Sequence, residues 1–157
     1  MTEQAPVITL RDVTPDNFDA VIDLKVHDDQ KHFVASNLYS LAEARVFPER
    51  YPLAVYADET PIGFAMYCFE EERQEYWVFR LMIAAEHQGK GYGRAAMRLL
   101  IDRMREIKGC RQIFISYEPE NDMARKLYTS MGFIITGEII EEEEVARLDL
   151  DETQAGG

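Results

Sequence analysis

QGKGYGRAAM, residues 88–97, joins two contrasting segments near the middle of a chain of 157 residues. Before it, residues 76–83 (YWVFRLMI) are almost continuously apolar, which is typical of a central strand covered on both faces. After it, residues 93–108 place apolar side chains at helical spacing and end before Gly109. Glycines that lead into a helix direct backbone N–H groups and the positive helix end at one spot, which makes a site for an anion. The sequence therefore predicts a strand, an anion-binding loop and a helix in direct succession.

Further helices and strands are predicted on both sides of this unit. Apolar runs predict strands, whereas a threonine–proline pair and a capping-box spacing predict helix starts. The expected strands are residues 7–13, 53–57, 62–69, 76–83, 112–117, 133–137 and 145–150, with 141–144 as a hairpin turn. The expected helices begin at Thr14-Pro15 and at Ser40 and cover residues 93–108 and 121–131. This order predicts one α/β (α+β) domain over residues 1–150, with a mixed sheet flanked by helices, and a disordered tail over 151–157.

The charge of the chain is acidic and unevenly distributed. The sequence holds 17 Lys and Arg against 29 Asp and Glu, a net charge of −12. Residues 87–126 contain nine basic and five acidic side chains, whereas the remainder contains eight and 24. One interpretation is an acidic surface that aids solubility; the other is a basic patch for an anionic cofactor and acidic walls for a cationic substrate. No extended basic stripe is present, so a nucleic-acid partner is not expected.

The sequence also indicates a cytoplasmic protein. Its first residues, MTEQAPVITLRDV, are polar, unlike a signal peptide, and no apolar run approaches the length of a membrane span, so no membrane partner is expected. Cys68 and Cys110 lack metal spacing and are expected to be unpaired, unreactive thiols. The His and Asp side chains of residues 27–32 match no standard metal spacing either, and no metal is expected.

Three kinds of phosphate-binding loop were compared with the glycine stretch. The spacing of a P-loop, Gly-x-x-x-x-Gly-Lys-Ser/Thr, is absent. Gly91-x-Gly93-x-x-Ala96 does match the dinucleotide-binding fingerprint, and Glu118 follows a later strand. However, the motif lies past the midpoint of the chain, after a meander of hairpin strands, and too little chain remains for two mononucleotide-binding halves. The third kind of loop depends on a second motif.

That second motif lies on the last predicted helix. Gln88-x-x-Gly91-x-Gly93, together with NDMARKLY at residues 121–128 and MGF at 131–133, resembles the signature segments of the GNAT family of N-acetyltransferases. The resemblance spans about residues 7–150, and GFAMY, QGKGYG and ARKLYTSMGF are most like the spermidine/spermine (polyamine) N-acetyltransferases. It implies a twisted, mostly antiparallel mixed sheet of about seven strands flanked by about four helices, in which the two central strands splay apart.

The resemblance implies that acetyl-CoA is the cosubstrate. Backbone amides of the glycine loop would hold the pyrophosphate, and the backbone of residues 81–83 would pair with the pantetheine arm. An amide near Met82 would stabilise the oxyanion that develops on the acetyl carbonyl. Asn121 is expected both to contact the arm and to cap its helix. The expected cofactor-binding residues are Leu81, Met82, Ile83, Gln88, Gly89, Lys90, Gly91, Tyr92, Gly93, Arg94 and Asn121.

The resemblance further implies direct transfer of the acetyl group to a primary amine in a ternary complex. Tyr128 matches the general acid that protonates the departing CoA thiolate, because a usual pKa of about 10 keeps tyrosine protonated at neutral pH. The amine must lose a proton before it attacks. Glu75 is one candidate base, with Asp28 and Asp29 behind it, and a water relay is another, since Trp77 stands where some family members place a basic glutamate. The acidic candidates for holding the other ammonium groups of the acceptor are Asp28, Asp29, Glu70, Glu71, Glu72 and Glu75.

Other functions remain open at this point. The acceptor could be an aminoglycoside, a protein N-terminus or another small amine in place of a polyamine or diamine. A non-catalytic acyl-CoA-binding module is a different class of function that fits the same loop. The expected partner is a small cationic amine, and a homodimer through the late strands is left open.

Overall fold

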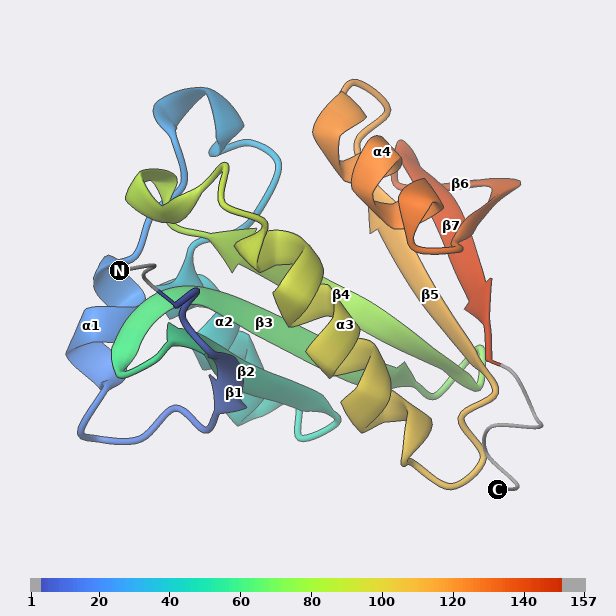
Figure 1. Ribbon diagram of the computed structural model, residues 1–157. Coiled ribbons are helices and arrows are strands. Elements are labelled where there is room, and N and C mark those ends of the chain that lie inside the picture. The colour runs from blue at the N-terminus through green and yellow to red at the C-terminus, as the bar shows by residue number, and fades with distance from the viewer. Residues whose placement is uncertain (1–3, 151–157) are drawn as a thin grey trace.

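The computed structural model describes residues 4–150, and the expected tail over 151–157 lies outside the described residues. Figure 1 shows helices on both faces of one twisted sheet. The helices are α1 (Phe18–Asp23), α2 (Asn37–Val46), α3 (Tyr92–Arg105) and α4 (Asp122–Ser130), with 3-10 turns η1 (Asp28–Gln30) and η2 (Ala85–His87). The strands are β1 (Ile8–Arg11), β2 (Arg50–Ala57), β3 (Thr60–Glu70), β4 (Glu75–Ile83), β5 (Gln112–Tyr117), β6 (Ile134–Ile140) and β7 (Glu143–Asp149).

The seven strands form one open sheet in the order β1-β2-β3-β4-β5-β7-β6. Every neighbouring pair is antiparallel except β4 and β5, which are parallel and joined by the crossover through α3. The expected mixed, mostly antiparallel sheet with four flanking helices is therefore confirmed.

The parallel pair splays apart at one end, as the family resemblance implied. β4 and β5 pair at only three positions, from Tyr76 opposite Ile113 to Val78 opposite Ile115, although both strands continue beyond them. On its other side β4 carries a bulge, because Tyr67 pairs with Val78 while the preceding Met66 pairs with Arg80. A bulge bends its strand and interrupts regular pairing. The bend begins where the pairing with β5 stops, so the two strands diverge from there.

The two faces of the sheet bury separate cores. One core packs α3 and the Tyr128 ring of α4 against inward side chains such as Ile113, Ile115 and Tyr117 of β5. The opposite face packs Val21 of α1 with β2, β3 and β4, and a small cluster includes Phe114 of β5. Successive residues of a strand point to opposite faces. Odd-numbered residues of β5 therefore face α3 and α4, and even-numbered residues face the side of α1 and α2.

Three local predictions were wrong. Helix α1 begins at Phe18, with Asn17 as its N-cap, and not at Thr14-Pro15, which precede it as a turn. Helix α2 starts earlier than Ser40, because Ser36 is its N-cap and accepts a hydrogen bond from the backbone N–H of Tyr39 at 3.1 Å. Ser40 is instead buried inside the helix. The last hairpin turn is shorter than residues 141–144: β6 continues past Gly137, whose positive φ of 88° accompanies a shift in the pairing register, and the turn comprises residues 141 and 142.

Candidate active site

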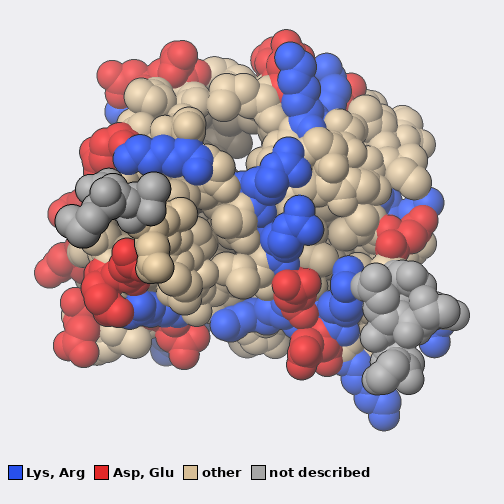
Figure 2. Space-filling model, viewed as in Figure 1, with Lys and Arg blue, Asp and Glu red and all other residues tan. Residues whose placement is uncertain are grey.

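A pocket of about 1100 Å³ opens where β4 and β5 separate. Its lining combines the C-terminal halves of both strands with the glycine loop, the segment 26–35 before α2, the end of β3, the start of α4 and the β6–β7 hairpin. Figure 2 shows a hollow in the molecular surface between the two groups of strands, with Lys and Arg side chains gathered near it. The pocket therefore brings together segments that are distant in the sequence, at the splayed end of the β4–β5 pair.

The glycine loop lies at one end of this pocket and has the backbone geometry that an anion site needs. Gly89 and Gly91 have φ of 78° and 83°, a left-handed conformation that side chains with a Cβ rarely adopt. Gly91 is the N-cap of α3, and a Cβ added at either glycine would meet no atom within 4 Å. The loop therefore exposes backbone N–H groups and the positive end of a 14-residue helix to open space.

Of the other loop residues that were expected to bind the cofactor, some line the pocket and one does not. Tyr92, Gly93 and Arg94 line the pocket together with Gly89 and Gly91, and Arg94 also donates a hydrogen bond to Ser130 of α4 at 2.6 Å. Lys90 is exposed and does not line the pocket. A long lysine side chain there would reach a bound anion from the rim.

Gln88 anchors the loop to the end of β4. Its side-chain nitrogen donates to the backbone carbonyl of Ile83 at 2.8 Å and to the side-chain oxygen of Gln30 at 2.9 Å. Gln30 donates back to Gln88 at 3.2 Å, so the two amides form a reciprocal pair. Gln88 was expected to bind cofactor; in the described contacts its amide fixes the loop relative to β4 and to η1.

The exposed edge of β4 is the second element of this end. Leu81, Met82 and Ile83 all line the pocket, beyond the last residue of β4 that pairs with β5. An extended chain could be added along such an edge by backbone hydrogen bonds. The carbonyl of Ile83 is already engaged by Gln88, which leaves residues 79–82 as the segment for such an added chain.

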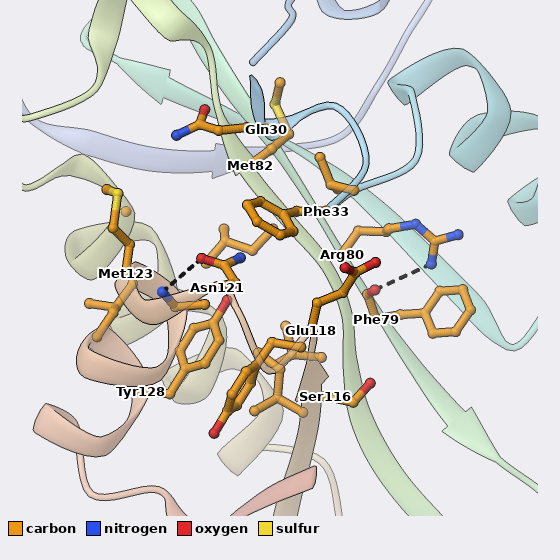
Figure 3. Close-up of a pocket in the computed structure, with 18 of the residues that line it drawn as sticks. Gln30, Phe33, Phe79, Arg80, Met82, Ser116, Glu118, Asn121, Met123 and Tyr128 are labelled. Atoms are coloured by element: carbon orange, nitrogen blue, oxygen red, sulfur yellow. Dashed lines mark hydrogen bonds between the residues drawn. The ribbon is translucent and has the colours of Figure 1, made fainter. Parts of the chain in front are cut away.

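Tyr128 projects from α4 into the same space. Its side chain is 8% exposed, and its ring contacts those of Tyr117 and Phe133, with centroids 5.8 and 5.9 Å away. Burial, with a smaller effect from Tyr117, raises the pKa of the Tyr128 hydroxyl above its ordinary value, so the group is protonated at neutral pH. In Figure 3 this hydroxyl points toward Asn121, into the pocket. Asn121 is the N-cap of α4, and its Oδ1 accepts a hydrogen bond from the N–H of Ala124 at 3.2 Å.

The acidic residues that the sequence suggested for the acceptor do not gather at one place. Glu70, at the end of β3, lines the pocket. Glu71 and Glu72 are exposed in the β3–β4 turn, and Asp28 and Asp29 are exposed in η1. None of these four lines the pocket.

Glu75 is occupied by other groups. It accepts hydrogen bonds from the Arg73 guanidinium at 2.6 Å and from the Trp77 indole N–H at 3.3 Å, and it does not line the pocket. Asp28 is likewise paired with Lys31 at 2.8 Å, and this ion pair lowers the pKa of Asp28. A carboxylate held by a cation is a weak proton acceptor, because protonation would break the pair.

Three carboxylates that the sequence interpretation did not assign to the acceptor do line the pocket. Glu118 follows β5, and Glu141 and Glu143 lie in the β6–β7 hairpin. Glu143 accepts a hydrogen bond from Ser116 at 2.8 Å. The alternation of β5 was a usable signal, since Ser116 and Glu118 fall on the same face, but the position of the hairpin follows only from the fold.

A single carboxylate holds two of the arginines that line the pocket. Glu43 of α2 pairs with Arg80 at 2.7 Å through one oxygen and with Arg50 through the other. The Phe79 ring contacts both guanidinium groups, whose carbons are 4.5 Å (Arg50) and 4.2 Å (Arg80) from its centroid. Burial lowers the pKa of Arg80, although Glu43 opposes this effect. The bulge in β4 accounts for the arrangement, because it places the adjacent Phe79 and Arg80 on the same face.

Neither a metal-binding cluster nor a membrane-spanning helix occurs among residues 4–150. Among residues 4–150, no group of three or more His, Cys, Asp and Glu side chains is arranged to hold a metal ion. No helix in that range is long and apolar enough to cross a membrane. Cys68 and Cys110 are both free and buried, and burial raises the pKa of each thiol to about 11.

Known proteins share both the sequence and the architecture of this chain. Residues 11–133 match the model described as the acetyltransferase (GNAT) family. The chain is 32% identical over 138 residues to the spermine/spermidine N(1)-acetyltransferase of Bacillus subtilis (strain 168), an alignment that covers 84% of this chain and 91% of that protein. Among proteins with shorter matches is the streptothricin acetyltransferase of Streptomyces lavendulae, 32% identical over 61% of this chain and 48% of its own length.

Solved structures share the fold. The spermidine N-acetyltransferase of Vibrio cholerae, determined with CoA and spermine, superposes with a TM-score of 0.73 at 20% identity, over 96% of this chain and 98% of that one. At these identities the similarity supports the fold.

Proposed function

Because the chain belongs to the acetyltransferase (GNAT) family and is an acetyl-CoA-dependent N-acetyltransferase, we propose that its acceptor is a polyamine or diamine such as spermidine or spermine. The observation that supports this most directly is the group of carboxylates in one pocket, Glu70, Glu118, Glu141 and Glu143, which come from three parts of the fold. Each exposed ion pair contributes only about 0–1 kcal/mol, so a polycation that engages several of them gains more than a monoamine. The nearby arginines do not cancel this acidity fully, because Glu43 is paired with Arg50 and Arg80, and Glu75 and Glu138 are paired with Arg73.

The residues of the glycine loop fit the pyrophosphate of acetyl-CoA. We propose that the backbone amides of residues 89–94 hold it at the N-terminus of α3. The added-strand position along β4 suits the amide groups of the pantetheine arm, with Asn121 on the opposite side. An N–H near Met82 would then stabilise the negative charge on the acetyl oxygen.

Tyr128 is proposed as the acid that protonates the leaving thiolate. Its hydroxyl is held in the pocket by a buried ring, and its raised pKa keeps the proton available across the physiological range. Acetyl-CoA supplies the acetyl group; the chain positions it, supplies the proton and draws the cationic amine into the acidic end.

A panel of amines tests the proposal. Purified protein with acetyl-CoA would be mixed with spermidine, spermine, putrescine, an aminoglycoside or a basic peptide, and release of the CoA thiol would be followed. The expected result is the highest kcat/KM with spermidine or spermine. Turnover of only the aminoglycoside or peptide would contradict a polyamine acceptor while leaving the acetyl-transfer activity in place. Binding of acetyl-CoA without turnover of any amine would favour the non-catalytic acyl-CoA-binding function.

A further inference from the structure

The reaction needs a proton acceptor, and Glu75, the first candidate from the sequence, is occupied by Arg73 and Trp77. An alkyl ammonium has a pKa of about 10.4, so forming the neutral amine at pH 7 costs about 4–5 kcal/mol. A carboxylate near the attacking nitrogen would lower this cost by taking the proton as the amine binds. The inference below rests on the proposed function, since it concerns the amine acceptor of that site.

We propose that Glu118 is the general base that removes this proton from the acceptor ammonium. Glu118 directly follows the last residue of β5, Tyr117, at the splayed end, and it lines the pocket. Figure 3 shows its carboxylate reaching into the pocket, while Tyr128 enters from α4. Because β5 alternates, Glu118 belongs with Ser116 to the face opposite the one on which Tyr117 contacts Tyr128. The proposed base and acid thus approach the splayed gap from opposite faces of the sheet.

This placement suits the geometry of acetyl transfer. The amine must attack the thioester carbonyl from one side, and the thiolate must receive a proton near the sulfur as it leaves. The reaction therefore needs a base near the nitrogen and an acid near the sulfur. Glu118 and Tyr128 have such separate positions, on either side of the gap between β4 and β5.

The other carboxylates of the region already have partners that oppose this role. Glu43 is paired with two arginines, and Glu75 with Arg73 and an indole N–H. Glu143 accepts the hydroxyl of Ser116, and Glu70 accepts the backbone N–H of Glu72 at 3.0 Å. No ion pair is recorded for Glu118 among residues 4–150. Glu141, the remaining carboxylate of the pocket, lies in the turn between β6 and β7, whereas Glu118 directly follows β5 at the splayed gap. Position and partners therefore both favour Glu118 among the pocket carboxylates.

The surroundings of Glu118 strengthen it as a base. Desolvation raises its pKa, Glu120 on the same loop raises it next, and Glu143 of β7 adds to this, whereas His32 of the segment before α2 lowers it. Arg80 of β4 and Tyr128 of α4 line the same pocket. A carboxyl with a raised pKa holds a transferred proton better than an ordinary glutamate does.

The proton balance of the step is complete. The ammonium gives one proton to the Glu118 carboxylate, and the freed nitrogen lone pair forms the C–N bond while the C–S bond breaks. Tyr128 donates its proton to the departing thiolate, and the second proton lost from nitrogen as the amide forms restores Tyr128. The products are the N-acetyl amine and CoA thiol, and Glu118 returns its proton to solvent.

The test compares Glu118→Gln, which keeps the shape and removes the basic oxygen, with wild type. The variant is expected to lose at least about a hundredfold in kcat/KM for spermidine at pH 7. Because the free amine then replaces the base, this deficit should shrink about tenfold for each pH unit up to the amine pKa. A readout independent of turnover is a carbon-13 NMR titration of the carboxyl groups in the protein without acetyl-CoA, in which the Glu118 signal should titrate above an ordinary glutamate. The affinity for CoA, measured by calorimetry, should stay within twofold of wild type.

Two matched variants separate a base from a binding group. Glu120→Gln removes the neighbouring charge, so the acid limb of kcat/KM should move to lower pH together with the Glu118 NMR signal. Glu143→Gln should raise KM for spermidine several-fold with little change in kcat. The role of Glu118 would be overturned if Glu118→Gln kept the wild-type rate and pH profile, or if its deficit were the same at every pH. Wild-type turnover of spermidine is measured first, so that a failure of the acceptor proposal is distinguished from a failure of this one.

Discussion

The two ends of the pocket are built in different ways. At the proposed cofactor end, the groups available for binding are mainly backbone: two glycines with positive φ, the N-terminus of α3 and the exposed edge of β4. At the acceptor end they are side chains, contributed by the segment before α2, β3, β5 and the β6–β7 hairpin. Figure 3 shows side chains from both ends, with Met82 and Asn121 toward the first and Arg80 and Glu118 toward the second.

This difference suggests how specificity and chemistry are divided. A backbone site depends on φ angles and on the start of a helix, so few side chains there can vary its chemistry. A side-chain site can change its acceptor by single substitutions without moving the backbone. We expect changes at the cofactor end to act on acetyl-CoA affinity and changes at the acceptor end to act on amine selectivity.

The largest effect is expected where both ends meet, at Tyr128. Tyr128→Phe should lower kcat about a hundred- to a thousandfold, because the thiolate would leave without a proton donor. The affinity for acetyl-CoA should change by less than threefold, since the buried ring is retained. Steady-state kinetics and calorimetry measure the two quantities. Tyr117→Phe, which removes the hydroxyl of a neighbouring ring, is the control; an equal loss of kcat there would mean that the effect is not specific to the hydroxyl of Tyr128.

A backbone substitution sharpens the comparison at the cofactor end. Gly91→Ala forces a Cβ onto a residue with φ of 83°, which costs about 1–2 kcal/mol, and the affinity for acetyl-CoA should fall about tenfold. Spermidine KM at saturating acetyl-CoA should change little. Gly93→Ala is the control, and the free energy of unfolding is measured for both variants. Gly93 lies within a helix, and a Cβ there would make only ordinary contacts, 3.8 Å from Ile83 and 3.9 Å from Leu127. Equal destabilisation by both substitutions would remove φ as the explanation.

At the acceptor end, the shared carboxylate is the corresponding target. Glu43 is 15% exposed, and Glu43→Gln would leave Arg50 and Arg80 without their anion, which should lower the unfolding free energy by about 2–3 kcal/mol. The added positive charge should raise KM several-fold for spermine and less for a monoamine. Denaturant melts and amine kinetics test both effects, with the exposed Glu49→Gln as control. Weaker acetyl-CoA binding without a change in amine KM would contradict the division between the two ends.

The smallest effect is expected from the contact that bridges the two ends. Gln30→Ala removes the reciprocal amide pair with Gln88 but leaves the hydrogen bond from Gln88 to Ile83. A net hydrogen bond contributes about 1 kcal/mol, so acetyl-CoA affinity should fall no more than about fivefold. A larger loss of acetyl-CoA affinity, measured by calorimetry, would show that the acceptor end strongly influences cofactor binding, which would contradict the division between the two ends.

The fold could be predicted largely from local patterns. The apolar run at 76–83 and the exact bounds of β5, residues 112–117, depend on residue types within each segment. The errors arose where two local signals competed. Ser40 and Glu43 have capping-box spacing, but Ser36 lies one turn earlier and caps the helix, which leaves Ser40 in its interior. Gly137 suggested the end of a strand, yet it accommodates an irregularity within β6.

The parts of the candidate site that depend on neighbouring residues in the sequence were the easiest to predict. Gly89 and Gly91 stand out in the sequence because few other residues adopt their φ values. Glu118 and Glu143 meet only because β5 pairs with β7, and Glu75 is unavailable because Arg73 holds it. These contacts depend on strand order and side-chain direction, which residue types and spacing within a segment do not specify.

Between the described residues of β4 and β5, sheet pairing consists of three rungs, Tyr76–Val78 against Ile113–Ile115. In mechanical terms these three residue pairs are the backbone pairing that joins two parts of the sheet. One part contains β1 to β4, and the other contains β5, β7 and β6. A force that pulls the two parts of the sheet apart would break the hydrogen bonds of these pairs one after another, starting at the splayed end, and not all at once. A pantetheine arm bound along β4 would add hydrogen bonds at that splayed end. In a single-molecule pulling experiment, the rupture force of this enzyme would therefore report whether its cosubstrate is bound.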